Sequence, residues 1–484
     1  MEEQVQHILY NVYSPPSENS NPRDALQEIN LLWENPQFYQ ALFTLFKNQS
    51  IDPNIRKLSI IVLKQQIHFH WDHFSPEFQQ VFLQNIPELV IGITTKEPQY
   101  LPYFEHLISK TFIQYFNSYW VQLLTSLFPA SKDHFITGLL FLICLLKVVL
   151  NDKEVQHAYM TNEQRKESLK TFFYSIFEIV TAFHVSSEAD CYLRTLCLKI
   201  ALSMVKLFPS LCLETNFYPW YQTVAWCISP ESANTLEPSF ELPAFSFSFP
   251  LNDVTSNFFA ELLNLFRQCQ LVFLHHENRD EVPFSTQLFL IVSNIILSPD
   301  WTNNSNQNLF IPFFEFFKGL ICYAKTSWTN YYLGNFPQIL QQLFFPLFML
   351  PPNALEIVSE SPFQFIDDYH IETFDNNDDH TLPNQEAYSA LGSLASKNSE
   401  THEILFAVAV SALESYCSNN NVIELYSLFQ FASSYWGALV LSQNEAVTKF
   451  NDHLLQMLVE SFKIAESPQK WLFQSAILLL LYEI

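Results

Sequence analysis

Glycine is scarce in this chain, with only 6 among 484 residues. The turns of β-hairpins and the loops that cradle phosphate groups both use glycine, because a residue without a Cβ adopts positive φ at no steric cost. The glycines also stand singly, so the chain has no glycine-rich phosphate loop. This scarcity predicts an all-α chain. The sequence also contains no motif of a nucleophile elbow, the turn that presents a catalytic serine. We therefore expect no catalytic residues, no cofactor and no enzymatic activity.

Basic residues are also in short supply. Lys and Arg number 24 against 49 Asp and Glu, for a formal charge of −25. No Lys or Arg occurs between Lys325 and Lys397. A broad phosphate-binding face would have to form against this negative field. We expect neither direct nucleic-acid binding nor binding to anionic membranes.

The chain lacks the marks of secretion and of membrane insertion. Its eight cysteines form no C-x-x-C pair, which fits buried thiols in a reducing compartment. The first ten residues are acidic and have no hydrophobic signal region. The most apolar stretch, Ile136 to Leu150, is too short for a membrane span and contains Lys147, so we expect a buried helix there. A cytosolic or nuclear protein is predicted.

A metal site is not expected. The best group is His68, His70 and His73, but side chains two residues apart point to different sides of a helix, and no cysteine or H-E-x-x-H motif accompanies them. The paired acids Asp367-Asp368 and Asp378-Asp379 lack the alternate spacing and the glycine of a calcium loop.

Four predicted helix starts near the N-terminus share one pattern, a capping residue followed by proline. The capping side chain accepts a hydrogen bond from an orphan amide, and proline fills the first helical position, where its missing N–H costs nothing. Regular restarts with no strand between them indicate a helical repeat. The pairs are Asn21-Pro22, Asn35-Pro36, Asp52-Pro53 and Ser75-Pro76.

The helices that follow these starts have apolar faces. In the helix after Asn35, apolar residues at i, i+4, i+7 and i+8 form one face. Apolar residues in the helix before it follow this spacing more loosely. These faces predict packing against neighbouring helices. The first face consists of Phe38, Leu42, Leu45 and Phe46, and the second of Leu26, Ile29 and Trp33.

The third helix, from about 55 to 71, is apolar over most of its circumference and is therefore expected to be flanked on both sides. Lys57, Lys64 and His68 fall within about 40° of one another at 100° per residue. They form a narrow polar stripe that faces either solvent or a partner.

Paired helices continue downstream with a length of about 35 to 45 residues, which is the period of HEAT or armadillo repeats. In such repeats a helical hairpin buries its faces only by stacking on the next. The predicted fold is a right-handed α-solenoid of HEAT/ARM-type helical hairpins. The expected pairs are 76–92 with 98–116, 118–128 with 133–150, 163–184 with 188–207, and later pairs within 214–275, 284–325, 331–397, 400–433 and 446–482.

Two segments interrupt this pattern. Residues 229–252 are rich in proline and phenylalanine, and we expect an ordered loop, although the alternating Phe245, Phe247 and Phe249 could also form a strand. Residues 350–382 form an acidic loop that is either merely solvated or a docking surface for a basic partner. The candidate residues for binding a basic cargo are Asp367, Asp368, Asp375, Asp378 and Asp379.

The sequence IRKLSIIVLKQQIHFHW at 55–71 resembles the N-terminal repeat of importin-beta family nuclear transport receptors. The matching positions are Arg56, the pair Leu63-Lys64, Ile67 and Trp71. The upstream segment NPQFYQALFTLF is similar to the preceding helices of the same domain.

Three later segments resemble the importin-seven/importin-eight subgroup and, less closely, the CAS-type exportins. They are FFPLFM at 344–349, SESPFQFI at 359–366 and AYSAL at 387–391. Asp367 stands where that family has an arginine. Because family members are longer than this chain, the resemblance implies the N-terminal arch of a receptor.

The resemblance implies an importin that carries basic protein cargo, such as ribosomal proteins or histones, under the control of Ran-GTP. It also implies that Phe-Gly nucleoporin segments bind between outer helices and that the protein is a monomer. The implied location is the cytoplasm, the nucleus and the nuclear envelope at the nuclear pore. The implied regions are Ran-binding repeats at 1–128, central repeats at 129–349, the acidic loop at 350–382 and further repeats at 383–484. The candidates for Ran binding are Arg56, Lys57, Lys64, Gln65 and His68.

Two alternatives remain open at this point. The first is a CAS-type exportin, in which Ran and cargo bind together. The second is a cytosolic HEAT-repeat scaffold that does not bind Ran.

Overall fold

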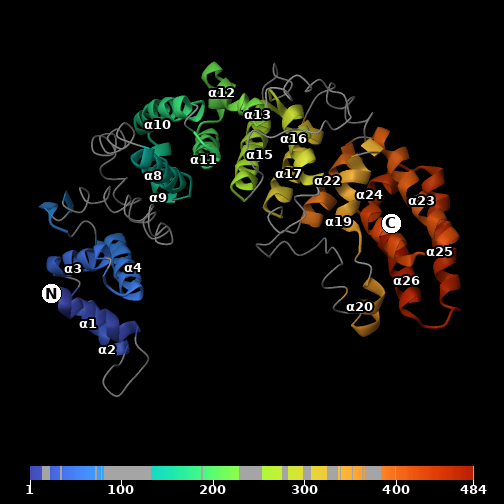
Figure 1. Cartoon of the computed structure of the whole chain (residues 1–484), viewed down its shortest axis with the longest axis horizontal. Coiled ribbons are helices and arrows are strands. Elements are labelled where there is room, and N and C mark those ends of the chain that lie inside the picture. The colour runs from blue at the N-terminus through green and yellow to red at the C-terminus, as the bar shows by residue number, and fades with distance from the viewer. Residues whose placement is uncertain are drawn as a thin grey trace. The chain divides into compact units, whose positions relative to one another are not determined.

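The chain folds into two units, Met1–Pro209 and Ser210–Ile484, and each is described by itself (Figure 1). The computed structural model describes residues 1–13, 22–32, 35–48, 50–70, 74–77, 79–80, 132–151, 153–186, 189–227, 253–274, 282–297, 307–323, 336–337, 339–350, 353–361, 365, 383–397 and 399–482. In these ranges some helical side chains, including that of His68, are not described.

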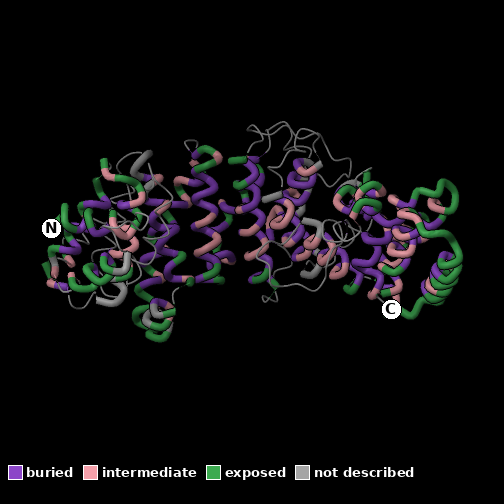
Figure 2. The backbone as a smooth tube through the Cα atoms, turned by 90° about the horizontal axis from the view of Figure 1, so that it is seen from below, coloured by how far each residue is buried: buried purple, intermediate pink, exposed green. Residues whose placement is uncertain are grey.

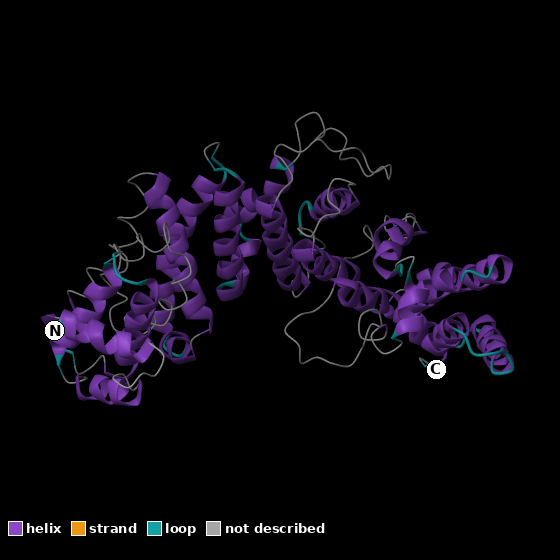
Figure 3. Cartoon of the chain, turned by 60° about the horizontal axis from the view of Figure 1, so that its bottom comes forward, coloured by secondary structure: helices purple, strands orange, loops and turns teal. Residues whose placement is uncertain are grey.

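Helices make up both units, and the described residues contain no strand (Figure 3). This confirms the all-α prediction. The first unit contains α1 (Glu2–Tyr13), α2 (Pro22–Leu32), α3 (Pro36–Lys47), α4 (Pro53–His70), α8 (Lys132–Asn151), α9 (Lys153–Met160), α10 (Glu163–His184) and α11 (Cys191–Leu207). The second contains α12 (Tyr218–Tyr221), α13 (Thr223–Trp226), α15 (Asp253–Leu274), α16 (Ser285–Leu297), α17 (Gln307–Tyr323), α19 (Phe345–Phe348), α20 (Ala354–Glu360), α22 (Pro383–Lys397), α23 (His402–Asn419), α24 (Val422–Leu441), α25 (Glu445–Ser461) and α26 (Pro468–Leu481), with short 3-10 and π segments between them.

The predicted helix starts at Pro22, Pro36 and Pro53 are confirmed, because α2, α3 and α4 begin at these residues. Asn21 lies outside the described residues, so its cap stays a prediction, as does the cap at Ser75. Asn35 Oδ1 accepts a hydrogen bond from the Gln37 amide at 3.0 Å, and Asp52 Oδ1 accepts one from the Asn54 amide at 2.7 Å. Each cap satisfies an amide that has no partner inside its helix.

The predicted apolar face of α3 is buried at all four positions, Phe38, Leu42, Leu45 and Phe46. The prediction for α2 was partly wrong. Ile29 is buried but Leu26 is half exposed, and Ala25 takes its place in the core because it lies one turn before Ile29 on the same side of the helix.

Helix α8 contains the apolar stretch from Ile136 to Leu150 and is a buried core helix, as predicted. Most of its described side chains are buried, Ile136, Leu140 and Leu150 are half-buried, and Lys147 is exposed. No helix in the described part of the chain combines the length and the apolar character that a membrane crossing needs.

The phenylalanines of the second unit form a continuous seam. Helices α15, α17, α22, α24 and α26 pack on one another in that order, and the sides that face each other are buried (Figure 2). Aromatic pairs bridge successive elements, with ring centroids 6.4 Å apart for Phe266–Phe316, 5.2 Å for Phe314–Phe344 and 4.8 Å for Phe345–Phe431. Each pair adds about 0.5–1.5 kcal/mol beyond its buried area.

Later repeat boundaries differ from the prediction in detail. Helices α10 and α11 match the expected pair, whereas α24 runs to Leu441, beyond the predicted end at 433. Helix α9 was not predicted. The proposed loop at 229–252 lies outside the described residues.

The cysteines behave as small core residues. Of the seven whose side chains are described, five are buried, and all seven are free thiols. Burial raises the pKa of Cys197 to about 12 and holds the pKa of Cys269 well above its usual range. These thiols therefore stay protonated and unreactive at neutral pH.

Two glycines allow neighbouring helices of the second unit to approach closely. A Cβ on Gly392 of α22 would lie 2.6 Å from the backbone oxygen of Ser434 in α24. A Cβ on Gly319 of α17 would lie equally close to Oε1 of Gln270, which is the flexible end of a side chain.

We expect Gly392→Ala to destabilise the second unit by about 1–3 kcal/mol, because a backbone atom cannot move aside and the strain exceeds the roughly 1 kcal/mol gained in helix propensity. Gly319→Ala is the matched control and should change stability by less than about 1 kcal/mol, since the Gln270 amide can rotate away. Thermal unfolding of both variants checks this. Equal losses would contradict the packing described at Gly392.

A buried histidine should make the first unit sensitive to acid. Burial, aided by the nearby charge of Arg194, lowers the pKa of His184 to about 3. The unfolded chain takes up a proton near pH 6.5 and the folded chain does not, so stability falls as the pH drops from about 6.5 towards 3, by at most about 1.4 kcal/mol per pH unit. The unfolding temperature of His184→Met should fall less between pH 6.5 and 4.5 than that of wild type or of the exposed-site control His157→Gln. An unchanged pH profile would contradict the account.

Candidate partner-binding surface on helix α4

Helix α4 is held against both α1 and α3. Ile55, Ile60 and Leu63 are buried on its inner side. At the open end of the hairpin, Phe74 packs on Tyr39 with ring centroids 4.4 Å apart, and burial raises the pKa of Tyr39 to about 12. Helix α4 thus packs against two neighbouring helices, and the expectation that it is flanked on both sides stays a prediction.

Arg56 belongs to the packed side of α4. It is 4% exposed, and its Nε donates a hydrogen bond to the carbonyl oxygen of Phe46 at 2.9 Å. The guanidinium also lies 5.6 Å from the centroid of the Phe46 ring. Because the last carbonyls of a helix have no partner inside it, Arg56 closes the end of α3 and fixes the turn between α3 and α4.

The same arrangement recurs at the α10–α11 turn. Arg194 of α11 is buried and donates to three carbonyl oxygens at the end of α10 and in the loop, those of His184, Ser186 and Ala189. Arg194 follows its N-cap residue Asp190 by four positions, just as Arg56 follows Asp52.

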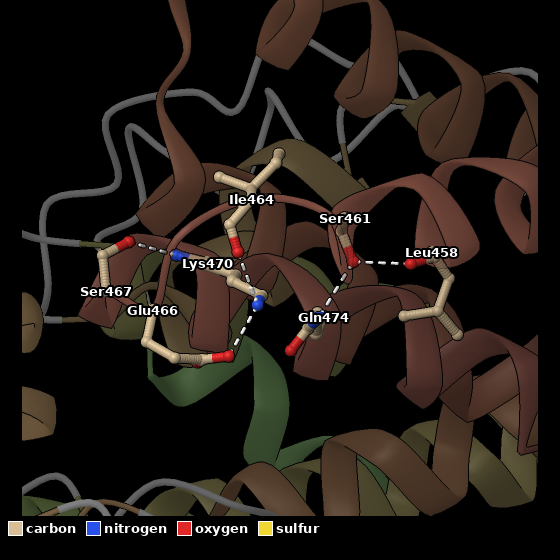
Figure 4. A network of polar contacts seen from close by, with 7 residues as sticks. All are labelled: Leu458, Ser461, Ile464, Glu466, Ser467, Lys470 and Gln474. Atoms are coloured by element: carbon tan, nitrogen blue, oxygen red, sulfur yellow. Dashed lines mark hydrogen bonds and ion pairs between the residues drawn. The ribbon is translucent and has the colours of Figure 1, made fainter.

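A lysine fills this role at the α25–α26 turn (Figure 4). Lys470 is buried, and its Nζ donates to the carbonyl oxygen of Ile464 at 2.8 Å and to Glu466 Oε1 at 2.6 Å. Gln474 continues the network by donating to Ser461 Oγ at 2.9 Å. Three hairpins thus share a buried cation near the start of the second helix.

The exposed side of α4 presents the polar stripe. Lys57 and Gln65 are exposed and Lys64 is half-buried, with the half-buried Ile61 between them. Lys57 and Lys64 are two turns apart, which separates them by about 10 Å along the axis. The side chain of His68 lies outside the described residues. The exposed surface therefore unites Lys57, Lys64 and Gln65, and it does not include Arg56, because Arg56 is buried against the end of α3.

The acidic candidates cannot be placed in the same way. Asp367, Asp368, Asp375, Asp378 and Asp379 all lie outside the described residues. Within the segment predicted to be a loop, the structure has a short helix, α20, whose Ala354 and Val358 are buried. Phe365 is also buried and contacts Tyr426 and Trp471, with ring centroids 5.5 and 5.9 Å apart. The start of this segment is therefore anchored on α24 and α26.

The negative charge is divided unequally between the two units. Residues 1–209 contain 16 Lys and Arg and 20 Asp and Glu, and residues 210–484 contain 8 and 29. The formal charges are thus −4 and −21. The lysines on α4 lie in a nearly neutral unit. The second unit carries most of the negative charge, which attracts cations.

Metal chemistry finds no support in the part of the chain that is described. No group of three His, Cys, Asp or Glu side chains lies close enough there to hold an ion.

Sequence reasoning missed the structural role of Arg56. The signal that could have revealed it is the recurrence of an acidic residue and a basic residue four positions apart at helix starts, as in Asp52–Arg56, Asp190–Arg194 and Glu466–Lys470.

Comparison with known proteins bears directly on this surface. The importin-beta N-terminal domain family matches residues 25–91, a range that includes most of α2 and all of α3 and α4. Solved structures match the whole chain. The exportin Cse1 in its cargo-free, cytoplasmic state matches with a TM-score of 0.60 and 13% identity over 99% of this chain and 57% of Cse1.

Lph2 of S. cerevisiae, described as a bidirectional nuclear transport receptor, matches with a TM-score of 0.59 and 13% identity over 94% of this chain and 47% of Lph2. The chain has the karyopherin fold. It spans about half the length of these two solved karyopherins. No curated protein sequence matches it significantly. The importin-seven/importin-eight subgroup stays a prediction.

Replacing Arg56 by methionine should destabilise the first unit by about 1–3 kcal/mol, because the Phe46 carbonyl loses its partner in a buried site. Lys57→Met is the matched control, one residue along and exposed, and should change stability by no more than about 0.5 kcal/mol. Chemical denaturation of the two variants measures the difference. A tolerated Arg56→Met would show that Arg56 does not hold the turn.

Proposed function

We propose that this chain is a nuclear transport receptor that carries basic protein cargo through the nuclear pore and is regulated by Ran-GTP. The observation that carries the proposal is the match of residues 25–91 to the importin-beta N-terminal domain, since this range contains the exposed stripe of α4. The karyopherin fold over the whole chain supports it. In this role the protein catalyses no reaction.

Ran binding is assigned to Lys57, Lys64 and Gln65, and His68 stays a candidate from the sequence alone. Two cations about 10 Å apart, with an amide next to the second, suit a flat protein surface with acidic and polar groups. Arg56 acts as a positioning residue, because it fixes the turn that orients α4 but is itself buried.

Cargo binding is assigned to the second unit. Its formal charge of −21 favours basic proteins such as ribosomal proteins or histones through long-range attraction. The acidic segment with Asp367, Asp368, Asp375, Asp378 and Asp379 also contains Glu372 and contributes six of these charges within 13 residues. Phe365 anchors the start of this segment on helices α24 and α26.

Coupling between the binding of Ran-GTP and the binding of cargo sets the direction of transport. If Ran-GTP and cargo favour different curvatures of the helical stack, each lowers the affinity of the other, and a coupling of about 3 kcal/mol changes affinity about 150-fold. Phe-Gly nucleoporins binding between outer helices would carry a monomeric complex between the cytoplasm and the nucleus.

Export is the second candidate, because Cse1 is an exportin and Lph2 is described as bidirectional. In export, Ran-GTP and cargo strengthen each other. A cytosolic scaffold that does not bind Ran is the third reading. The three differ in how the chain responds to Ran.

The test is a binding assay with immobilised Ran loaded with GTP or GDP, with and without a histone as basic cargo. We expect retention by Ran-GTP and much less by Ran-GDP. Lys57→Glu combined with Lys64→Glu should weaken retention at least tenfold without changing helix content, because both cations of the stripe become anions.

Lys153→Glu combined with Lys206→Glu is the control, since these exposed lysines lie in the same unit but on α9 and α11. It makes the same change in net charge and should leave retention unchanged. Equal retention by both nucleotide states, or by neither, would refute the receptor. Release of histone by Ran-GTP selects import, and enhanced retention with histone selects export.

A further inference from the structure

A buried glutamine of the second unit has no hydrogen-bond partner. Gln270 of α15 is 6% exposed, and neither Nε2 nor Oε1 of its amide has a partner in the part of the chain that the structure describes. An amide that leaves water without gaining a partner retains the full free-energy cost of its desolvation. The packing around Gln270 is therefore less stable than the same packing around an apolar side chain.

The amide lies where α15 and α17 pack side by side (Figure 1). Its Oε1 would be 2.6 Å from a Cβ on Gly319, so the side chain of Gln270 rests on the bare backbone of α17. Both residues are close to a helix end, because α15 ends at Leu274 and α17 at Tyr323, each four residues further on.

Two polar contacts anchor α17 just before Gly319. Arg267 Nη1 of α15 donates a hydrogen bond to Glu315 Oε2, and Lys318 Nζ donates to Ser389 Oγ of α22 at 2.7 Å. Arg267 precedes the buried glutamine by three residues, and Glu315 precedes Gly319 by four, so α15 and α17 run in the same direction. The last turns of the two helices therefore lie together, beyond the contacts that anchor α17.

Apolar packing favours contact between these last turns. Phe273 of α15 and Leu320 of α17 are buried, and separating the turns would expose both side chains to water. Solvent is nevertheless near, because Leu271 and Leu274 are 36% and 45% exposed. Local separation of two helix ends is thus sufficient for water to reach Gln270 and supply the missing hydrogen bonds.

We propose that residues 270–274 and 319–323 form a local gate with two arrangements. The gate is closed in the structure described above, and it opens when the two helix ends separate and water pairs with the Gln270 amide. The contact between Arg267 and Glu315 is the pivot. The orphaned amide raises the free energy of the closed arrangement and so keeps the open one populated. A partner that binds the open arrangement would shift the equilibrium towards it. This inference depends on neither Ran binding nor cargo binding.

The test is hydrogen exchange of the full chain, measured by mass spectrometry at several low urea concentrations. Exchange through a local opening changes little with urea, because little surface becomes exposed, whereas exchange through global unfolding accelerates. In the wild type we expect urea-independent exchange of the backbone amides at 270–274 and 319–323, and urea-dependent exchange in the middle of α24.

Two variants should shift the gate in opposite directions. Gln270→Met keeps the length and the helix propensity of the side chain but removes the amide. It should slow exchange of both helix ends about tenfold and raise the unfolding temperature by about 2 °C or more. Gly319→Ala crowds the amide in the closed arrangement, so it should make the same exchange at least twofold faster.

Gln430→Met is the matched control. Gln430 is 3% exposed on α24 of the same unit, but it has an interaction partner. This variant should not raise the unfolding temperature, and it should leave the urea-independent exchange of 270–274 and 319–323 unchanged.

Two results would overturn the proposal. One is exchange of both helix ends with the same urea dependence as the middle of α24, because the ends would then open only when the whole unit unfolds. The other is a Gln270→Met variant whose unfolding temperature falls, or whose helix ends exchange no more slowly than in the wild type. That result would show that the amide is satisfied in the closed arrangement, for example by a buried water molecule.

Discussion

A buried cation at the start of the second helix is the contact on which the geometry of three described hairpins depends, α3–α4, α10–α11 and α25–α26. A helix end leaves carbonyl oxygens without partners, and a tight turn buries them. Arg56, Arg194 and Lys470 each supply the missing donors from the next helix. The turn then has one conformation, and the exposed faces of both helices point in defined directions.

This use of cations has a consequence for the surface. The chain has only 24 basic residues, and those that close turns are withdrawn from solvent. The exposed surface is thus more acidic than the composition alone indicates. The acidity is also concentrated in the second unit, while the lysines on α4 lie in a unit that is nearly neutral. The two units therefore differ in formal charge, −4 for the first and −21 for the second.

The sequence was sufficient for features that depend on neighbouring residues. The Asn35-Pro36 and Asp52-Pro53 starts, the buried face of α3 and the core position of α8 were predicted, because capping and helical periodicity are local. Leu26 was placed in the core wrongly. Leu26 lies three residues before Ile29 and Ala25 lies four before it, both spacings fit one helix face, and only the packing against α1 decides between them.

The candidate site shows the same limit. Periodicity grouped Lys57 and Lys64 correctly, but the resemblance to importins added Arg56, whose hydrogen bond to Phe46 spans a turn that no periodic pattern describes. The sequence does not distinguish a buried arginine from an exposed one. Arg56 is buried because it donates a hydrogen bond to the carbonyl oxygen of Phe46.

The central claim is that one chain binds Ran-GTP and a basic cargo with coupled affinities. Calorimetric titration of histone into the chain, alone and saturated with Ran-GTP, tests it most directly. The account predicts that Ran-GTP weakens the histone affinity by up to about 150-fold, and that histone weakens the Ran-GTP affinity by the same factor. Identical histone affinity in the presence and absence of Ran-GTP would contradict it.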